Sequence, residues 1–451
     1  MLNLRTHPVR HRARLRMSIA CVALTLIASA ALADWLQPDP SYRDALQNLR
    51  YATRDTIGHA DDAPRLDTLA VALLRLGRYA DATAIFQRVL AARPGDAAAR
   101  AALGKLAMFQ DRNVQAESLL SLAGQADGAR ADLYMTRLRR GDWKGASALA
   151  EEVGDLGRIP LLEHLGEGES FVVGGAERAE VPFERTWPAP IVRVKLNGTV
   201  VLMAVDTGAP GLLLDPSTLR VNRVARVGGQ RVVTWDGSRV AVGNAMVQKI
   251  EIGGVSLANV PAGTVSLHKY SLGANPQSAY VAGILGADVL RRFDVTLDFK
   301  RNSIALRRAG GLVPAGTRVP FERWGEDELM VWGSINGGRR MALMLATGLA
   351  ETGVAAPQGV MEEVGIKPGG ISKYVKGAGS WLQGSAWAPV TVPTLTIGAV
   401  AADRLPGWSG AMDAAELWRH GVRRDGLVGP GFFRGRRVTF DWAGSALVFE
   451  D

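Results

Sequence analysis

Cysteine is almost absent from this sequence: Cys21 is the only one among 451 residues. It lies in an N-terminal segment that we expect to be cleaved, so residues 34–451 contain no thiol. Disulfides, a catalytic thiolate and thiolate metal sites are thereby excluded. A chain of this length can bury hydrophobic cores large enough to fold without disulfides.

Histidine is also scarce. Residues 34–451 contain His59, His164, His268 and His420, and none has the spacing of a metal-binding motif. The sequence also lacks the Gly-x-Ser-x-Gly elbow of serine hydrolases and a phosphate-binding Gly-Lys-Ser/Thr loop. We therefore predict no metal and no other cofactor.

The positive charge is not clustered. The formal net charge is +9, and five arginines of the N-terminal segment leave +4 for residues 34–451. The remaining arginines are scattered, whereas a nucleic-acid-binding protein needs a basic stripe or patch. We therefore predict no nucleic-acid partner.

Long hydrophobic runs are missing except at the N-terminus. Residues 17–33 are almost wholly apolar, follow a basic segment without acids, and end in the small-x-small sequence Ala31-Leu32-Ala33. This pattern predicts a signal peptide over residues 1–33, cleaved after Ala33, and hence a periplasmic or secreted protein. The alternative is an uncleaved membrane anchor, because the apolar run has about the shortest length that spans a bilayer.

Residues 62–155 are rich in alanine and leucine at helical spacing and follow a connecting segment, residues 34–61. One stretch resembles the tetratricopeptide repeat family, with its key positions at Ala70, Gly77, Tyr79, Ala82, Phe86, Leu90 and Pro94. A weaker second repeat has Asp111 where glycine is usual in the turn. Because two or three repeats barely bury a continuous core, we expect them to pack on the rest of the chain or to bind a protein partner.

The amino-acid composition changes after residue 155. Residues 156–180 read as a linker, and the following residues are rich in valine, threonine and glycine in short alternating runs, which predicts β structure. This β region is duplicated: residues 181–185 (VPFER) recur at 319–323, and 295–299 (VTLDF) recur as VTFDW at 438–442. We predict two β lobes, residues 181–310 and 311–451, related by a pseudo-two-fold axis.

An apolar strand in the first lobe ends in Asp206-Thr207-Gly208-Ala209, and Ile284-Leu285-Gly286 follows further along the chain. This combination resembles the retropepsin-like aspartic proteases. The resemblance implies an all-β bilobal fold with Asp206, Thr207 and Gly208 as catalytic residues and Ile284, Leu285 and Gly286 behind them. It also implies a peptide or protein substrate in the cleft between the lobes, which Ala209 would help to line.

The same family places a β-hairpin over its substrate. Residues 231–240 fit this flap, because the turn Asp236-Gly237 is flanked by β-forming residues. Trp235 would then overhang the substrate, or instead pack on its own sheet. The equivalent stretch of the second lobe, residues 373–387, contains Trp381 and Trp387, for which a place in the core is the simpler interpretation.

The second lobe departs from the family, because it has Ala346-Thr347-Gly348 where an Asp-Thr-Gly is expected. Aspartic proteolysis requires two carboxylates that share one proton, and Asp206 supplies only one. Glu351, or Asp206 of a second chain, would be a substitute. Three functions stay open: a peptidase that activates water with Asp206, an inactive relative that binds extended peptides in its cleft, or a structural envelope protein in which both modules are scaffolds.

Overall fold

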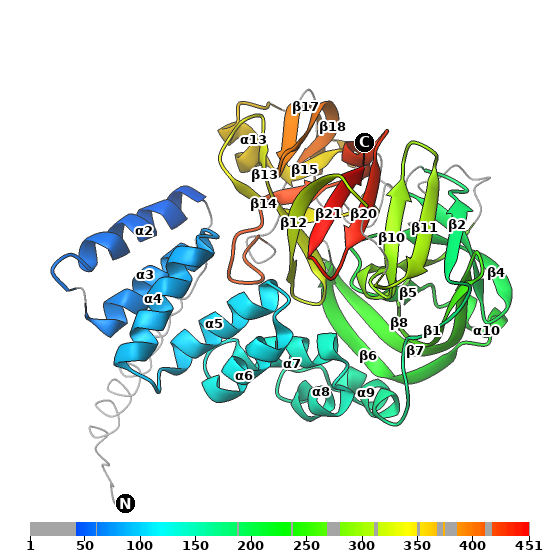
Figure 1. The fold of residues 1–451 in the computed structure, drawn as a ribbon, viewed down its shortest axis with the longest axis horizontal. Helices are drawn as coiled ribbons and strands as arrows, with labels where there is room; N and C mark the ends of the chain where they lie inside the picture. The colour runs from blue at the N-terminus through cyan, green and yellow to red at the C-terminus, as the bar shows by residue number, and fades with distance from the viewer. Residues whose placement is uncertain are drawn as a thin grey trace, which may run out of the picture.

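The computed structural model describes residues 42–59, 61–186, 189–235, 238–267, 280–310, 314–349, 352–367, 373–374, 386–410 and 417–450. A helical region comes first and curves along two β lobes (Figure 1). In these described residues no helix is long and apolar enough to cross a membrane. The predicted fold class, tetratricopeptide-like helices followed by a bilobal acid-protease-like β fold, is confirmed.

The helical region consists of antiparallel helix pairs. Its helices are α2 (Tyr42–Asp55), α3 (Ala63–Arg75), α4 (Tyr79–Ala92), α5 (Ala97–Phe109), α6 (Asn113–Ala123), α7 (Ala129–Arg140), α8 (Trp143–Ala150), the 3-10 helix η1 (Leu156–Arg158) and α9 (Ile159–Gly166). Asp62, Asp96 and Asp142 cap three of them, each side chain accepting a hydrogen bond from a backbone N–H three residues on. Helical structure thus extends beyond residues 62–155 at both ends.

The first lobe is built on an eight-stranded sheet in the order β1-β8-β5-β9-β4-β3-β7-β6. The strands are β1 (Val172–Gly175), β3 (Ile191–Leu196), β4 (Thr199–Val205), β5 (Leu212–Leu214), β6 (Ala225–Trp235), β7 (Ser238–Ile252), β8 (Val255–Thr264) and β9 (Val281–Leu285). Two short helices, α10 (Thr218–Val221) and α12 (Ala287–Leu290), complete it. Its interior is apolar because the alternating residues of these strands point into one core.

The second sheet has 13 strands and joins both lobes. The second lobe contributes β12 (Thr317–Trp324), β13 (Glu328–Ile335), β14 (Met341–Leu345), β15 (Val354–Pro357), β16 (Lys373–Tyr374), β17 (Ala386–Ile397), β18 (Val400–Gly410), β19 (Gly426–Val428), β20 (Arg437–Asp441) and β21 (Ala446–Glu450), with helices α13 (Gln358–Glu363) and α15 (Pro430–Phe433). The first lobe adds β2 (Arg178–Pro182), β10 (Phe293–Asp298) and β11 (Ser303–Arg308).

The same pattern of strand pairing occurs in both lobes, as the duplicated sequence predicts. Strand β4 pairs in parallel with β9, and β14 pairs in parallel with β19. The lobes meet where β10 pairs with β20, and there the duplicated residues Thr296 and Thr439 lie opposite each other, with their hydroxyl oxygens 2.6 Å apart. A pseudo-two-fold axis therefore passes between these two threonines.

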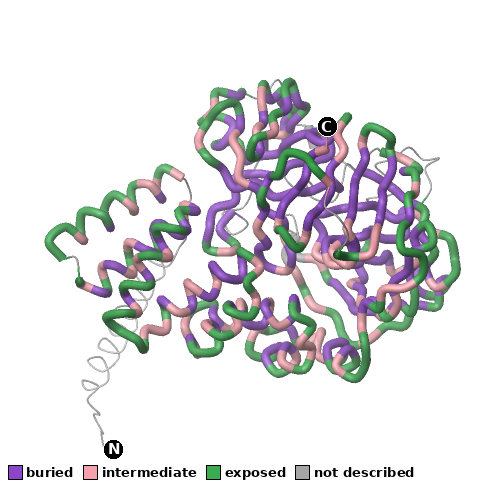
Figure 2. Tube along the Cα trace, in the orientation of Figure 1, coloured by how far each residue is buried: buried purple, intermediate pink, exposed green. Residues whose placement is uncertain are grey.

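The helical repeats pack mainly on the second lobe. One buried cluster contains residues of α3 to α9 together with Trp324, Met330 and Ala346. The rings of Phe109 and Trp324 stack with their centroids 5.0 Å apart. Figure 2 shows buried residues between the helices and toward the lobes, and many exposed residues on the outer side of the helices. The expectation that the repeats pack on the rest of the chain agrees with this interface.

Gly77 lies in close contact with Trp332 of the second lobe. A Cβ on Gly77 would meet the indole of Trp332, and the residue has φ +70°. We predict that Gly77→Ala lowers the free energy of unfolding by about 1–3 kcal/mol more than Gly58→Ala. Gly58 is the matched control, because it has φ +76° but nothing within 4 Å of an added Cβ. Urea unfolding measures both; equal losses would contradict the proposed close contact.

Candidate functional site

Asp206 lies directly after β4, at the point where the two lobes meet. Its backbone N–H donates to the carbonyl oxygen of Leu285 at 3.1 Å, which fixes the turn against β9. Its Oδ1 atom accepts hydrogen bonds from the backbone N–H of Gly208 at 2.8 Å and of Gly348 at 2.9 Å. The residue is fully buried. Both lobes thus provide backbone donors to one carboxylate oxygen.

The two loops that carry the motif, residues 206–209 and 346–348, are called the motif loops, and they are also joined through their threonines. The backbone N–H of Thr207 donates to Thr347 Oγ1 at 3.0 Å, and the N–H of Thr347 donates to Thr207 Oγ1 at 3.3 Å. The Thr347 hydroxyl in turn donates to the carbonyl oxygen of Val205 at 3.1 Å. All these groups are buried, so the reciprocal bonds hold the two loops in one fixed arrangement.

Ala346 occupies the position in the second lobe that matches Asp206. It follows β14, and its N–H donates to the carbonyl oxygen of Val428 at 2.9 Å, as that of Asp206 does to Leu285. A Cβ on Gly208 would lie 3.1 Å from the Ala346 Cβ. The first-lobe motif therefore packs closely on a methyl group where its partner carboxylate would begin.

The residues predicted behind Asp206 are indeed close to it. Ile284 and Leu285 belong to β9 and are fully buried, as is Ala209. A Cβ on Gly286 would come within 2.5 Å of the Ala209 carbonyl oxygen, so the chain passes directly beneath the motif loop. These residues position Asp206, and their contact with a substrate remains a prediction.

The predicted flap is the hairpin of β6 and β7, in which Trp235 pairs with Ser238 across the end. Its turn residues Asp236 and Gly237 lie outside the described residues, as do Glu351 and Trp381. Trp387, by contrast, is buried in the core that contains the helical repeats.

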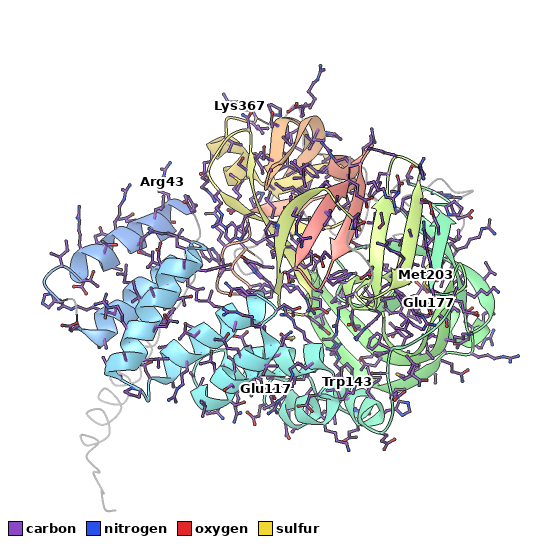
Figure 3. All side chains as sticks on the ribbon, viewed as in Figure 1. Arg43, Glu117, Trp143, Glu177, Met203 and Lys367 are labelled. Atoms are coloured by element: carbon purple, nitrogen blue, oxygen red, sulfur yellow. The ribbon has the colours of Figure 1, made fainter. Side chains whose placement is uncertain are left out.

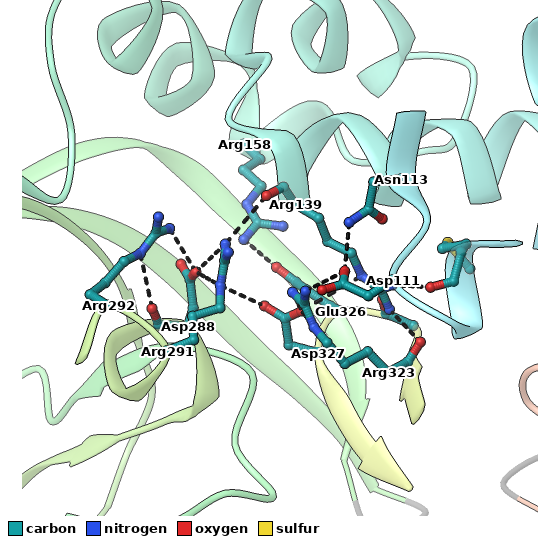
Figure 4. A network of polar contacts seen from close by, with 12 residues as sticks. Asp111, Asn113, Arg139, Arg158, Asp288, Arg291, Arg292, Arg323, Glu326 and Asp327 are labelled. Atoms are coloured by element: carbon teal, nitrogen blue, oxygen red, sulfur yellow. Dashed lines mark hydrogen bonds and ion pairs between the residues drawn. The ribbon is translucent and has the colours of Figure 1, made fainter. Parts of the chain in front are cut away.

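The structure reveals a charged cluster that sequence analysis missed (Figure 4). It joins Asp111 and Arg139 of the helical region to Arg291 of the first lobe and to Arg323 and Asp327 of the second. Asp327 pairs with Arg323, with Arg291 at 3.5 Å and with Arg139 at 3.6 Å. The only sequence signal was Asp111, an acid where a repeat turn normally has glycine; its carboxylate contacts Arg323 at 2.5 Å.

Burial changes the acid–base properties of this cluster. Burial alone would raise the pKa of Asp327, but Arg323, Arg291 and Arg139 outweigh it and hold the pKa well below its usual range. Burial and the neighbouring Arg323 lower the pKa of Arg139 to about 10. Asp327 and Arg139 therefore stay ionised at neutral pH. In the described part of the chain, no group of three or more His, Cys, Asp or Glu side chains is arranged to hold a metal ion.

Two pseudo-symmetric lobes with an Asp-Thr-Gly loop at their junction define an aspartic-protease-like protein. Residues 192–289, from β3 to α12, match the family described as Aspartyl protease. Residues 73–138 match the family described as Tetratricopeptide repeat. The chain thus contains a retropepsin-like domain with an N-terminal repeat region, as its sequence predicts. No curated protein matches the sequence.

Proposed function

We propose that this protein is an exported peptide-binding protein of aspartic-protease architecture that does not use the two-carboxylate peptidase mechanism. The observation that carries the proposal is the methyl group of Ala346, which packs at the position of the second carboxylate. Export rests on the N-terminal pattern of a basic segment, an apolar run and a small-x-small site.

The chemistry of the missing group supports loss of hydrolysis. In a working pair, the ionised carboxylate takes a proton from water while the protonated one polarises the scissile carbonyl. Asp206 accepts two backbone hydrogen bonds on Oδ1, an arrangement that suits a carboxylate acting as a base. A general acid to complete the pair is not supplied by Ala346. Losing one half of such a unit removes most of the rate enhancement.

Peptide binding does not depend on the second carboxylate. An extended peptide binds beside a hairpin through main-chain hydrogen bonds and through pockets for alternate side chains. Strands β6 and β7 form a long hairpin, and Val242 of β7 lies in the same buried cluster as Ala209 of the motif loop, which supports this mode of binding. We also propose that the helical repeats bind a separate protein partner. Part of their surface is packed on the second lobe, so the partner would bind the rest of that surface.

A second candidate function is hydrolysis with Asp206 as the single base. It is favoured by the intact environment of Asp206: both backbone donors and both threonines that stabilise such a turn are present.

The test is binding and hydrolysis of a mixed decapeptide library by residues 34–451, from acidic to neutral pH. We expect binding without cleavage. Cleavage that Asp206→Ala abolishes would contradict our proposal in favour of the second candidate. The absence of binding at every pH, with a folded protein, would reject both.

A further inference from the structure

A cavity of about 80 Å³ lies where the helical region meets both lobes. On the first lobe it is lined by Pro210 and Gly211, which follow the motif loop, and by Arg231 of the flap strand β6. Glu326 and Asp327 line it from the second lobe. It therefore borders the segment that directly follows the motif loop, the flap strand and the opposite lobe, which are the parts that would enclose a peptide near Asp206.

Helices α7, α8 and α9 close this cavity on its remaining side. Leu138, Leu161, Leu162 and Leu165 line it, and each is almost fully buried. Trp143 at the start of α8 lies between the helices and the first lobe (Figure 3), where its indole N–H donates to Ser170 Oγ at 3.2 Å. A peptide strand that runs from Asp206 toward this side would therefore end against helices α7, α8 and α9.

The polar lining is rich in guanidinium groups. Arg139, Arg158, Arg231 and Arg291 face three carboxylates, those of Asp288, Glu326 and Asp327. Nε of Arg139, Nη1 of Arg158 and Nε of Arg231 are buried without a hydrogen-bond acceptor among the described residues. Buried N–H groups of this kind favour an additional acceptor, and for a guanidinium a carboxylate is the best-matched one.

Arg231 is the arginine best placed to bind a ligand. Its ion pairs with Asp155 and Glu326 are both 3.6 Å long, beyond hydrogen-bond distance. Arg158, by contrast, already donates a short hydrogen bond to Glu326. The Arg231 side chain is about one-fifth exposed, and it lines the cavity from the flap strand β6.

We propose that this cavity is the closed end of the peptide-binding groove and that Arg231 binds the C-terminal carboxylate of the peptide there. The inference rests on the peptide-binding function proposed above. A cavity of about 80 Å³ holds a terminal group but not a continuing strand, which needs about 3.3 Å of length for each further residue. The protein would then recognise the ends of polypeptides rather than their interior segments.

The test compares the affinity of residues 34–451 for three forms of one mixed decapeptide library: free C-terminal acid, C-terminal amide, and an amide form with an internal glutamate at every position in turn. We expect the amide to bind about 10- to 100-fold more weakly than the acid, because a charged hydrogen bond is lost. Arg231→Met should remove this difference. Arg226→Met is the control on the same strand, because Arg226 is exposed and does not line the cavity.

Each outcome separates the two proposals. Equal binding of acid and amide would overturn the carboxylate site but leave peptide binding intact. Amide peptides rescued by an internal glutamate would show an acidic side chain as the ligand and overturn recognition of chain ends. If Arg231→Met fails to fold, Arg231→Lys, which keeps the charge but not the planar fork, should still reduce the preference for the acid. The absence of binding by any library would refute the underlying function.

Discussion

Ala346→Asp is expected to give this protein acid peptidase activity. The substitution places a second carboxylate beside Asp206, so that one proton can be shared between the two. A general acid contributes about 10²- to 10⁴-fold to such a reaction, and we expect a gain of this order over the parent chain. Because the pair must hold one proton, activity should fall on both sides of an acidic optimum.

The surrounding loop is already arranged for this carboxylate. In the first lobe, the N–H of Gly208 donates to the aspartate two residues earlier. The N–H of Gly348 stands in the same relation to position 346, and at present it donates across to Asp206 instead. The threonine bonds between the loops do not involve the Ala346 side chain, so they can persist in the variant.

Hydrolysis of the decapeptide library, read by mass spectrometry, measures the effect. Ala346→Asn is the matched control, because it adds a side chain of the same size without an acid. The double variant Asp206→Ala, Ala346→Asp should be as inactive as the parent. A folded Ala346→Asp protein that cleaves nothing at any pH would mean that the inter-lobe site is closed to substrate, and would count against the groove itself.

Asp327→Asn is expected to lower the free energy of unfolding more than Gly77→Ala does. Asp327 is buried and is the shared partner of Arg323, Arg291 and Arg139, which come from both lobes and from the helical region. Removing one partner of a buried ion pair leaves uncompensated charge and costs about 3–5 kcal/mol. Asp55→Asn is the control, because the exposed pair of Asp55 with Arg65 contributes about 0–1 kcal/mol.

The effect should depend on pH in a defined direction. The pKa of Asp327 is lowered on folding, so its contribution is fully present above the unfolded pKa of about 3.9 and is lost as the pH falls toward the folded value. Urea unfolding of parent and variant should therefore show a constant difference above about pH 5 that shrinks below pH 4. A difference that persists unchanged in acid would show that packing, not charge, is responsible.

Much of the fold could be predicted because its signals are local or repeated. The spacing of Ala82 and Phe86 in one helix, and the duplicated strands, each follow from short stretches of sequence. The replacement of a carboxylate at Ala346 could be predicted for the same reason, since the flanking Thr347-Gly348 keeps the register. Helix α9 was not predicted, because the glycines and acids around it suggest a linker while its apolar face is buried only by tertiary packing.

The charged cluster and the cavity beside it could not be predicted from the sequence. Arg139, Arg231 and Asp327 are far apart in the sequence, and each by itself resembles an ordinary surface residue. Only the docking of the helices on both lobes brings them together and removes them from water. Such sites depend on how whole domains pack on one another, and this packing cannot be predicted from the composition of the sequence or the spacing of its residues.

The pairing of β10 with β20 has a consequence for how this site can change. Thr296 and Thr439 meet there like the same residue of two identical subunits, yet they belong to one polypeptide. In a true homodimer, a substitution in the motif appears twice and removes both carboxylates together. In a covalently fused pair each copy changes alone, so one half can keep its aspartate and its hydrogen bonds while the other is released for a different task.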